Sequence, residues 1–418
     1  MSPPVGVATL AAPVAPPGWS RARFLALGLF TAWVVLTAGS CFAFRSGHVV
    51  ANGNETTWDR AIFTAINTST LTGFQQTMGL REMRVAGMIG PTLLLVLTLG
   101  GSFLSLTVGG LAASRILRMP HTASQIAWAA GTALLLSTLG GGAMLAASGR
   151  NVFEAIFQST SAFGNSGLWL GPLPGTTDGS SYLVLLPLVI LGGLGLPVLM
   201  EISDRLFGGP PLSRHSRVVL MLAGGIYLAG FVALVLAQAP VAWGGGAVAW
   251  RNTIASCSVA AINTRSAGLP FQSPAAFTVA GQWLLMALML IGAAPAGTGS
   301  GLKTTTLWQL ARGVRDVLRG RPVPRPFGIA AVWLVAFTVV LFAGILLLAT
   351  IEPQIAPDRL LFLCCSAIGN VGLSHDPVST TGPGLLVLSC LMLAGRMGAL
   401  AILWWMAETT SGADVLVG

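Results

Sequence analysis

Eight stretches of apolar residues are each long enough to cross the ~30 Å hydrocarbon core of a membrane as a helix of about 20 residues. Most charged residues lie in the shorter segments between them. The stretches cover residues 24–44, 86–112, 124–147, 182–206, 217–239, 276–292 with a continuation at 302–318, 327–350 and 384–407. This pattern predicts an all-α integral membrane protein, in which only the sixth span is expected to be broken.

Shorter segments separate the two members of each pair of spans, at residues 57–68, 151–163, 248–263 and 358–368. Because they are too short to span, each is predicted to be a re-entrant pore helix that enters and leaves on one side. Each leads to a glycine, and these glycines recur 94, 101 and 104 residues apart at Gly73, Gly167, Gly268 and Gly372. The spacing predicts four tandem span/re-entrant helix/span repeats arranged pseudo-fourfold around one ion pore.

The repeats are predicted at residues 22–115, 116–210, 211–322 and 323–418, after a flexible tail at 1–21. The hydrophobic fraction of 54%, the charged fraction of 8% and the mean hydropathy of +0.78 exclude a water-soluble globule. The net charge of +9 does not indicate nucleic acid, because the basic residues are spread over short loops. Twelve arginines fall on one side and eight on the other, which predicts a multi-pass plasma (inner) membrane protein with both termini cytoplasmic.

Four short segments ending at the repeated glycines are predicted to form a selectivity filter. The four segments have no side chain in common, so only their backbones can supply equivalent ligands. A ring of main-chain carbonyls can replace the water around a monovalent cation, and it carries no fixed negative charge. Glycine adopts the positive φ that such a turn requires, and the pore helices direct their negative ends at the ion. The predicted residues are Thr70, Leu71, Thr72 and Gly73; Gly164, Asn165, Ser166 and Gly167; Arg265, Ser266, Ala267 and Gly268; Gly369, Asn370, Val371 and Gly372.

The sequences TLTGF, AFGNSGL, NTRSAGL and AIGNVGLS resemble the four filter segments of the Trk/Ktr/HKT superfamily of potassium transporters. The similarity extends to LGGLGLPVLME (191–201), GAAPAGTGSGLKTTT (292–306) and AGRMG (394–398), and it is greatest to the Ktr-type membrane subunit. The resemblance implies potassium uptake with K⁺ held at the filter, Na⁺ as a candidate activating or coupled ion, a homodimer, and a cytoplasmic nucleotide-binding (RCK-type) regulatory subunit. In plant relatives serine at the first filter glycine goes with sodium preference, so Gly73 favours potassium.

Residues 292–301 contain four glycines and one proline inside what would otherwise be a long span. Continuous helix there is about 7 kcal/mol less favourable than in an alanine sequence, so the helix is predicted to break. The break follows Gly268 by about 25 residues, just below the filter, and we therefore predict an intramembrane gating loop at 293–301. The predicted gate residues are Gly297, Thr298, Gly299, Ser300, Gly301, Lys303 and Arg396.

Arg396 lies 12 residues from each end of its span, about 18 Å from either interface and beyond the reach of a snorkelling side chain. Its partners are expected to be loop carbonyls and water. Lys303 follows a sequence similar to a phosphate-binding loop, but Leu302 replaces the glycine that this motif requires. Arg265 is expected to point away from the pore, toward Glu154 or another outer carboxylate.

Two rival functions remain open. An alternating-access secondary cation transporter would show two larger repeats, broken helices and an ionisable residue at mid-membrane. A membrane-embedded enzyme would need a nucleophile or metal ligands converging at one depth, and the four histidines and five cysteines lack such spacing. We therefore expect no enzyme activity, no transition metal and no organic cofactor in this chain.

Overall fold

The computed structural model describes residues 19–46, 49, 56–75, 87–375, 380, 382–409 and 414–417. Most of the predicted tail at 1–21 lies outside these residues. The described residues form helices and loops, and their only strand-like pairing is an isolated bridge between Ile291 and Leu302. The all-α prediction is confirmed.

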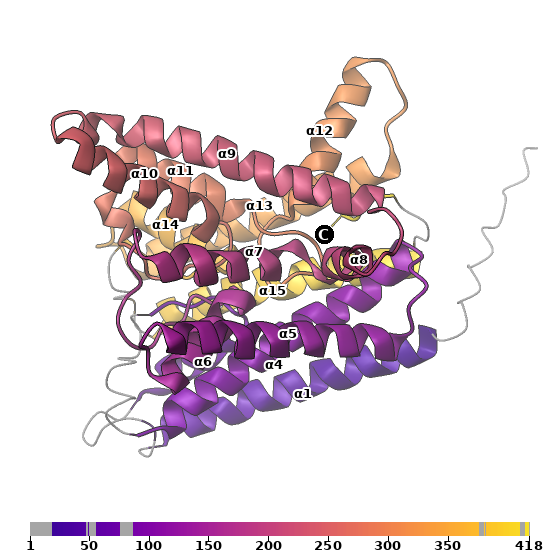
Figure 1. Cartoon of the computed structure of the whole chain (residues 1–418), viewed down its shortest axis with the longest axis horizontal. Coiled ribbons are helices and arrows are strands. Elements are labelled where there is room, and N and C mark those ends of the chain that lie inside the picture. The colour runs from indigo at the N-terminus through magenta and orange to yellow at the C-terminus, as the bar shows by residue number, and fades with distance from the viewer. Residues whose placement is uncertain are drawn as a thin grey trace, which may run out of the picture.

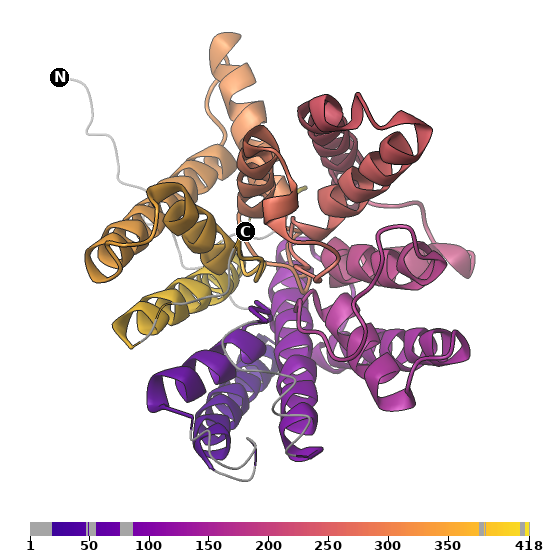
Figure 2. The same ribbon diagram turned by 90° about the vertical axis from the view of Figure 1, so that its left-hand side faces the viewer.

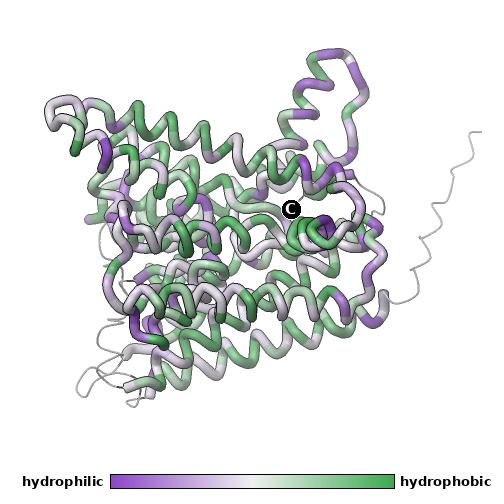
Figure 3. Tube along the Cα trace, in the orientation of Figure 1, coloured by the Kyte–Doolittle hydropathy of each residue, from purple (hydrophilic) through white to green (hydrophobic). Residues whose placement is uncertain are grey.

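Within the described part of the chain, six helices are long and apolar enough to cross a membrane, and they confirm six of the eight predicted spans. In Figure 1 most of them run lengthwise through the bundle, and Figure 3 shows apolar residues along their lengths with hydrophilic residues gathered toward both ends. They are α1 (Trp19–Arg45), α4 (Ile89–Ile116), α5 (Ala123–Ala147), α9 (Arg214–Ala242), α13 (Arg325–Ile351) and α15 (Pro383–Thr409).

The sixth predicted span is interrupted, as the sequence predicts. Helix α11 (Val279–Leu290) ends before the glycine-rich stretch, and α12 (Thr304–Leu318) begins after it. The backbone between them is irregular and contains positive φ at Ala296 and Gly301. Figure 1 shows α12 projecting from the bundle instead of continuing the line of α11.

The predicted span at 182–206 is also broken, which corrects the expectation of a single broken span. A short π-helix, η1 (Ser181–Leu185), leads into α7 (Leu186–Leu194), and α8 (Leu196–Leu206) then departs at 108°. Gly195 at the bend has φ +88°, a conformation that glycine adopts most readily. Pro197 follows in the first turn of α8, where its missing N–H costs nothing.

The four predicted re-entrant segments are helices whose ends lie within two residues of the expected positions. They are α2 (Trp58–Ser69), α6 (Val152–Gly164), α10 (Gly246–Asn263) and α14 (Pro357–Ile368). Each packs against the long helix that precedes it in the chain, α1, α5, α9 and α13 respectively. Figure 2 shows the chain passing around a common centre from indigo to yellow, so that the loops after these helices face one another. A short 3-10 turn, η2 (Pro274–Ala276), precedes α11.

Candidate functional site

The four predicted filter segments, here called the glycine segments (residues 70–73, 164–167, 265–268 and 369–372), meet through their backbones. A methyl group added to each repeated glycine would collide with, or press against, a carbonyl oxygen of the next segment. The contacts are Gly73 with Ser166 O, Gly167 with Ala267 O, Gly268 with Val371 O and Gly372 with Thr72 O. Because the fourth segment contacts the first, the contacts close a ring, with one carbonyl contributed by the residue before each glycine.

All four repeated glycines have positive φ, at +91°, +71°, +57° and +81°. An L side chain at such a φ is strained whatever the available space. Glycine is therefore required at these positions both by backbone conformation and by the close approach of the neighbouring segment. The remaining predicted residues of the glycine segments are also buried, apart from the partly exposed Arg265.

Three of the glycine segments contain a second left-handed residue two positions before the glycine: Leu71, Asn165 and Asn370, with φ near +50° to +57°. Asparagine tolerates this conformation, whereas leucine does so at a cost of roughly 1–2 kcal/mol. Such strain is concentrated at functional sites because the surrounding structure must impose it. The third segment follows a different path, with no positive φ at Ser266.

Two asparagines near the ends of α2 and α10 hold the glycine segments in place. Asn67 Oδ1 accepts hydrogen bonds of 2.9 Å from the N–H groups of Gly73 and Phe74, and Asn67 Nδ2 donates to Phe74 O. In the third repeat Asn263 bonds both backbone groups of Leu269 in the same way. The sequence prediction missed both residues, although the repeated Ile-Asn-Thr at 66–68 and 262–264 is a signal that identifies them.

A buried side-chain network joins the second and third glycine segments to the predicted gating loop. Asn165 Nδ2 donates to Thr298 Oγ1 at 2.9 Å, and Asn165 Oδ1 accepts from Ser266 Oγ at 3.0 Å. Thr298 Oγ1 in turn donates to Phe163 O, at the end of α6. In the fourth segment Asn370 Nδ2 bonds Thr72 Oγ1 of the first. Side chains thus link segments whose backbones already touch.

The 293–301 loop is seated on the break between α7 and α8. The Ala294 N–H donates to Gly193 O at 2.9 Å, and the Thr298 N–H donates to Gly192 O at 3.0 Å. In return, the Leu196 N–H donates to Ala296 O at 3.0 Å. The carbonyls at the end of α7 and the first N–H of α8 would otherwise lack hydrogen-bond partners within a helix. The break between α7 and α8 and the break between α11 and α12 thus supply hydrogen-bond partners to each other.

Arg396 connects this loop to the first glycine segment. Its side chain is 3% exposed, with Nε bonded to Thr70 O at 2.9 Å and Nη1 bonded to Thr298 O. The expected contact with a loop carbonyl is therefore present, whereas the contact with Thr70 was not predicted. The loop makes a further bond to the same helix, from Ser300 Oγ to Gly395 O at 2.9 Å.

Lys303 is buried beside Arg396. Its Nζ donates to Gly299 O at 2.5 Å, so it folds back on the loop that precedes it. Both cations line a cavity of about 10 Å³, together with Ser105 and loop residues including Gly297 and Ser300. Such a volume holds about one water molecule. Gly301, with φ +76°, forms the turn that brings Lys303 to this position.

Arg265 does not pair with Glu154, which corrects that prediction. Its Nη2 donates to Gly292 O at 3.2 Å, toward the start of the loop, and its Nε is buried without a hydrogen-bond partner. Glu154 instead lies against Gly171, in the connection after the second glycine segment. The outward pairing failed because α10 places the Arg265 side chain on the loop side of the third glycine segment.

Comparison with known proteins extends these observations. The family described as the cation transport protein TrkH matches residues 254–413. The chain is 28% identical over 266 residues to Ktr system potassium uptake protein D of Bacillus subtilis (strain 168), covering 60% of this chain and 59% of that protein. It is 31% identical over 278 residues to Ktr system potassium uptake protein B of the same organism, covering 62% and 60%.

The fold is similar to the crystal structure of the potassium transporter TrkH from Vibrio parahaemolyticus, with a TM-score of 0.73 at 17% identity. The match covers 92% of this chain and 84% of that one. At this level of identity the similarity establishes the fold alone. The chain spans about three fifths of the length of the uptake proteins it matches.

Proposed function

We propose that the chain, which is similar over about three fifths of its length to Ktr system potassium uptake proteins, is a member of the Trk/Ktr superfamily and carries potassium into the cell through a filter of backbone carbonyls. The relatives are named as uptake proteins, which are transport proteins and not enzymes. A membrane-embedded enzyme therefore has no support, and the question becomes how a cation passes.

The closed ring formed by the glycine segments carries this proposal. The residues before the four glycines place one carbonyl oxygen each against the next segment, at Thr72, Ser166, Ala267 and Val371. Neutral carbonyl dipoles bind a dehydrated monovalent cation yet allow it to leave, which conduction requires. The four pore helices end at these segments and add their negative dipole ends. We assign K⁺ to this ring, with Na⁺ as a candidate activating or coupled ion.

The 293–301 loop is the proposed gate. It contacts the second glycine segment through Thr298 and Asn165, and it is held by backbone bonds to α7 and by the Arg396 guanidinium. Irregular backbone at membrane depth is stable only where it is buried in protein or lines a cavity. Opening requires loss of a few hydrogen bonds rather than unfolding of a helix, which suits a movable barrier. Arg396 and Lys303 add a positive electrostatic barrier to cation passage when the loop is closed.

Regulation is assigned to a cytoplasmic nucleotide-binding (RCK-type) subunit, and the membrane subunit is proposed to be a homodimer. We assign α8, α12 and both termini to the cytoplasmic side, because the larger number of arginines lies there. Helix α12 projects from the bundle close behind the loop (Figure 1). Arg315 of this helix is exposed, as is Arg319 directly after its last residue. A partner that moves α12 would therefore act on the loop through Thr304, the first residue of the helix.

The decisive measurement is rubidium or potassium flux into liposomes for the wild type and Gly73→Ser, each with and without sodium. We expect potassium-selective flux in the wild type and a shift toward sodium in Gly73→Ser, because the serine must displace the Ser166 carbonyl. Absence of cation flux from correctly folded, reconstituted protein, tested together with its regulatory subunit, would overturn the proposal.

The alternating-access alternative gains one observation from the structure, because two spans are broken instead of one. Both breaks bond to each other beside the glycine segments, as discontinuous helices do around the binding sites of such transporters. Turnover separates the two mechanisms. Unitary currents in a planar bilayer support a pore. A flux that saturates at no more than about one ion for each conformational cycle, which takes microseconds to milliseconds, supports alternating access.

A further inference from the structure

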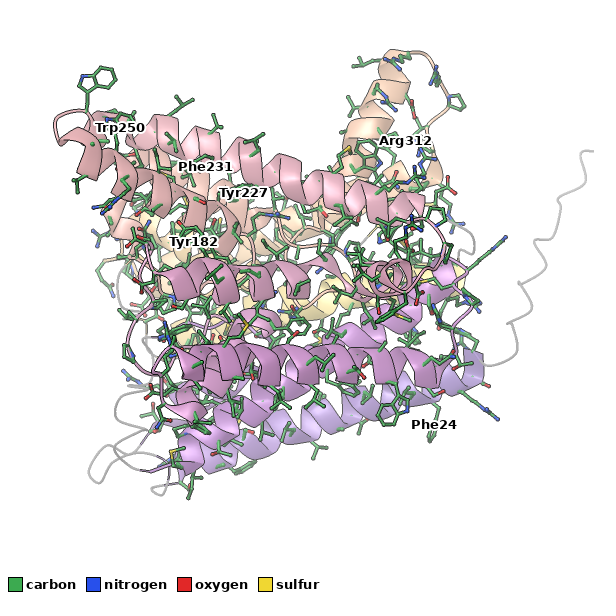
Figure 4. The ribbon with its side chains drawn as sticks, in the orientation of Figure 1. Phe24, Tyr182, Tyr227, Phe231, Trp250 and Arg312 are labelled. Carbon is green, nitrogen blue, oxygen red and sulfur yellow. The ribbon has the colours of Figure 1, made fainter. Side chains whose placement is uncertain are left out.

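A second cavity, of about 420 Å³, lies between α7 and α9 and reaches the third glycine segment. Its walls are mainly aliphatic, and loop residues Ala293 and Ala294 form part of them. The volume falls in the range of roughly 300–1,000 Å³ that is typical of small-molecule sites. Figure 4 labels Tyr227 of α9, which also lines this cavity.

Two polar side chains that line this cavity have buried atoms without partners. Arg265 Nε and Thr304 Oγ1 accept or donate no hydrogen bond within the protein, and Thr304 is 1% exposed. Arg265 has only its Nη2 engaged, by Gly292 O. None of the described residues that line the cavity is acidic, so the guanidinium has no counter-ion there. An unpaired charge at membrane depth is costly, and a bound anion would neutralise it.

We propose that this cavity binds a single-chain fatty acid, whose carboxylate accepts hydrogen bonds from Arg265 and Thr304 and whose chain lies between α7 and α9. The aliphatic walls suit the chain, and a guanidinium suits a carboxylate geometrically. Thr304 is the first residue of α12, a 15-residue helix, so its positive dipole end also favours the anion.

The depth of the cavity favours a fatty acid over a phospholipid. Lining residues Val219 and Tyr227 lie 5 and 13 residues after the start of α9 at Arg214. At 1.5 Å per residue, these positions are about 8 and 20 Å from that end of the helix. A small carboxylate can reach this depth, whereas a glycerophosphate headgroup belongs at the interface.

The site is positioned to act on the loop. Ala293 is the first residue of the loop, and it accepts a hydrogen bond of 3.2 Å from the N–H of Thr304, the first residue of α12. Ala294 is bonded to Gly193 of α7, another lining residue. A bound fatty acid would hold these elements together and keep the loop seated, which lowers cation flux. This effect rests on the proposed function, whereas the binding itself does not.

Two adjacent glycines of α9 provide a matched test of binding. A methyl group added at Gly224 or Gly225 meets no atom within 4 Å, but only Gly224 lines the cavity. We would measure binding of 11-(dansylamino)undecanoic acid to delipidated protein by fluorescence. Gly225→Phe should bind as the wild type does, whereas Gly224→Phe should bind at least tenfold more weakly. Equal binding by the two variants would overturn the site.

The headgroup is tested by competition. Oleate should displace the dansyl probe from the wild type at least tenfold better than methyl oleate, which lacks the charge that pairs with Arg265. Equal displacement would show that the cavity recognises apolar chains only, and the carboxylate assignment would fail. If Arg265→Gln still binds the probe but no longer distinguishes oleate from methyl oleate, the result supports the contact between Arg265 and the carboxylate.

The source of the occupant is settled by native mass spectrometry after purification from membranes. A bound fatty acid that is absent in Gly224→Phe supports the proposal, whereas a bound phospholipid or a second copy of the chain at this face overturns it. Failure of the proposed transport function can be distinguished from failure of the fatty-acid site, because a protein that gives no cation flux would still bind the fatty acid. Flux that is unaffected by oleate in the wild type would refute the coupling to the loop.

Discussion

Arg396 Nε donates a 2.9 Å hydrogen bond to the carbonyl oxygen of Thr70, a residue 326 positions earlier in the chain. The same guanidinium donates from Nη1 to Thr298 O of the 293–301 loop. Because the guanidinium is planar and permanently charged, its donors hold the two carbonyls in a fixed relation. One side chain of α15 thus ties the proposed gate to the proposed filter.

Arg396→Ala is expected to raise basal rubidium flux about tenfold. The substitution removes charged hydrogen bonds worth roughly 1.5–3 kcal/mol each and also removes a positive barrier from the pathway. Flux into liposomes is the measurement, with Arg312→Ala as the control, because Arg312 lies on the projecting helix α12 (Figure 4). Arg396→Lys should give an intermediate flux, since it keeps the charge but not the planar pair of donors. Unchanged flux in Arg396→Ala would contradict the tether.

Gly268→Ala is expected to abolish selective flux and to lower thermal stability. The added methyl group would collide with Val371 O, and φ +57° is strained for alanine by roughly 1–2 kcal/mol. Gly28→Ala in α1 is the matched control, because its methyl group meets no atom within 4 Å. That variant should keep full flux, with stability changed by less than about 1 kcal/mol. Thermal unfolding in detergent and flux in liposomes test both variants, and normal selectivity in Gly268→Ala would contradict the role of the ring.

Hydropathy and glycine spacing predict most of the helical framework. The length of the apolar stretches identifies the spans, because a helix needs about 20 residues to cross the membrane. The four shorter segments were identified as re-entrant because they are too short to cross it. The break at 292–301 was predictable because four glycines and a proline act additively on one helix. The break at Gly195 was not predicted, although three glycines (Gly192, Gly193 and Gly195) and Pro197 lie within six residues there and give a signal similar to that of residues 292–301.

Tertiary hydrogen bonds were the least predictable part of the site. The position of Arg396 within its span indicates that it must find backbone or water partners, but not that Thr70 is one of them. Arg265 was assigned to Glu154 by charge alone, whereas the direction of its side chain depends on the path of the third glycine segment. The sequence therefore shows which buried charged groups need hydrogen-bond partners, whereas the identity of those partners depends on the tertiary packing.

Asn67→Ala is expected to reduce discrimination between potassium and sodium about tenfold. The change leaves the Gly73 and Phe74 N–H groups without their acceptor, at roughly 1–3 kcal/mol for each buried group, so the turn that places the Thr72 carbonyl is released. Asn151→Ala is the control, since its side chain caps α6 through the Phe153 N–H and has no contact with a glycine segment. It should cost about 1 kcal/mol in stability and leave selectivity unchanged. Competition between rubidium and sodium in liposome uptake measures the difference, and equal selectivity in the two variants would exclude the clamp.

The break at Gly195 matters because the loop of the third repeat rests on it. The Leu196 N–H bonds Ala296 O at 3.0 Å, and a methyl group at Gly195 would collide with Pro295 O. A change at this glycine should therefore act on the loop, although Gly195 is about 100 residues away in sequence and contacts no residue of the glycine segments among its nearest atoms.

Gly195→Ala is expected to displace the loop and to raise basal flux several-fold, with a stability loss of roughly 1–3 kcal/mol from the glycine-specific conformation. Gly149→Ala separates displacement from strain, because Gly149 also has positive φ, at +92°, but nothing lies within 4 Å of the added methyl group. That variant should lose a similar amount of stability and keep the wild-type flux. Both quantities are measured on the same reconstituted preparations. If the two variants change flux equally, the contact between the breaks does not control passage.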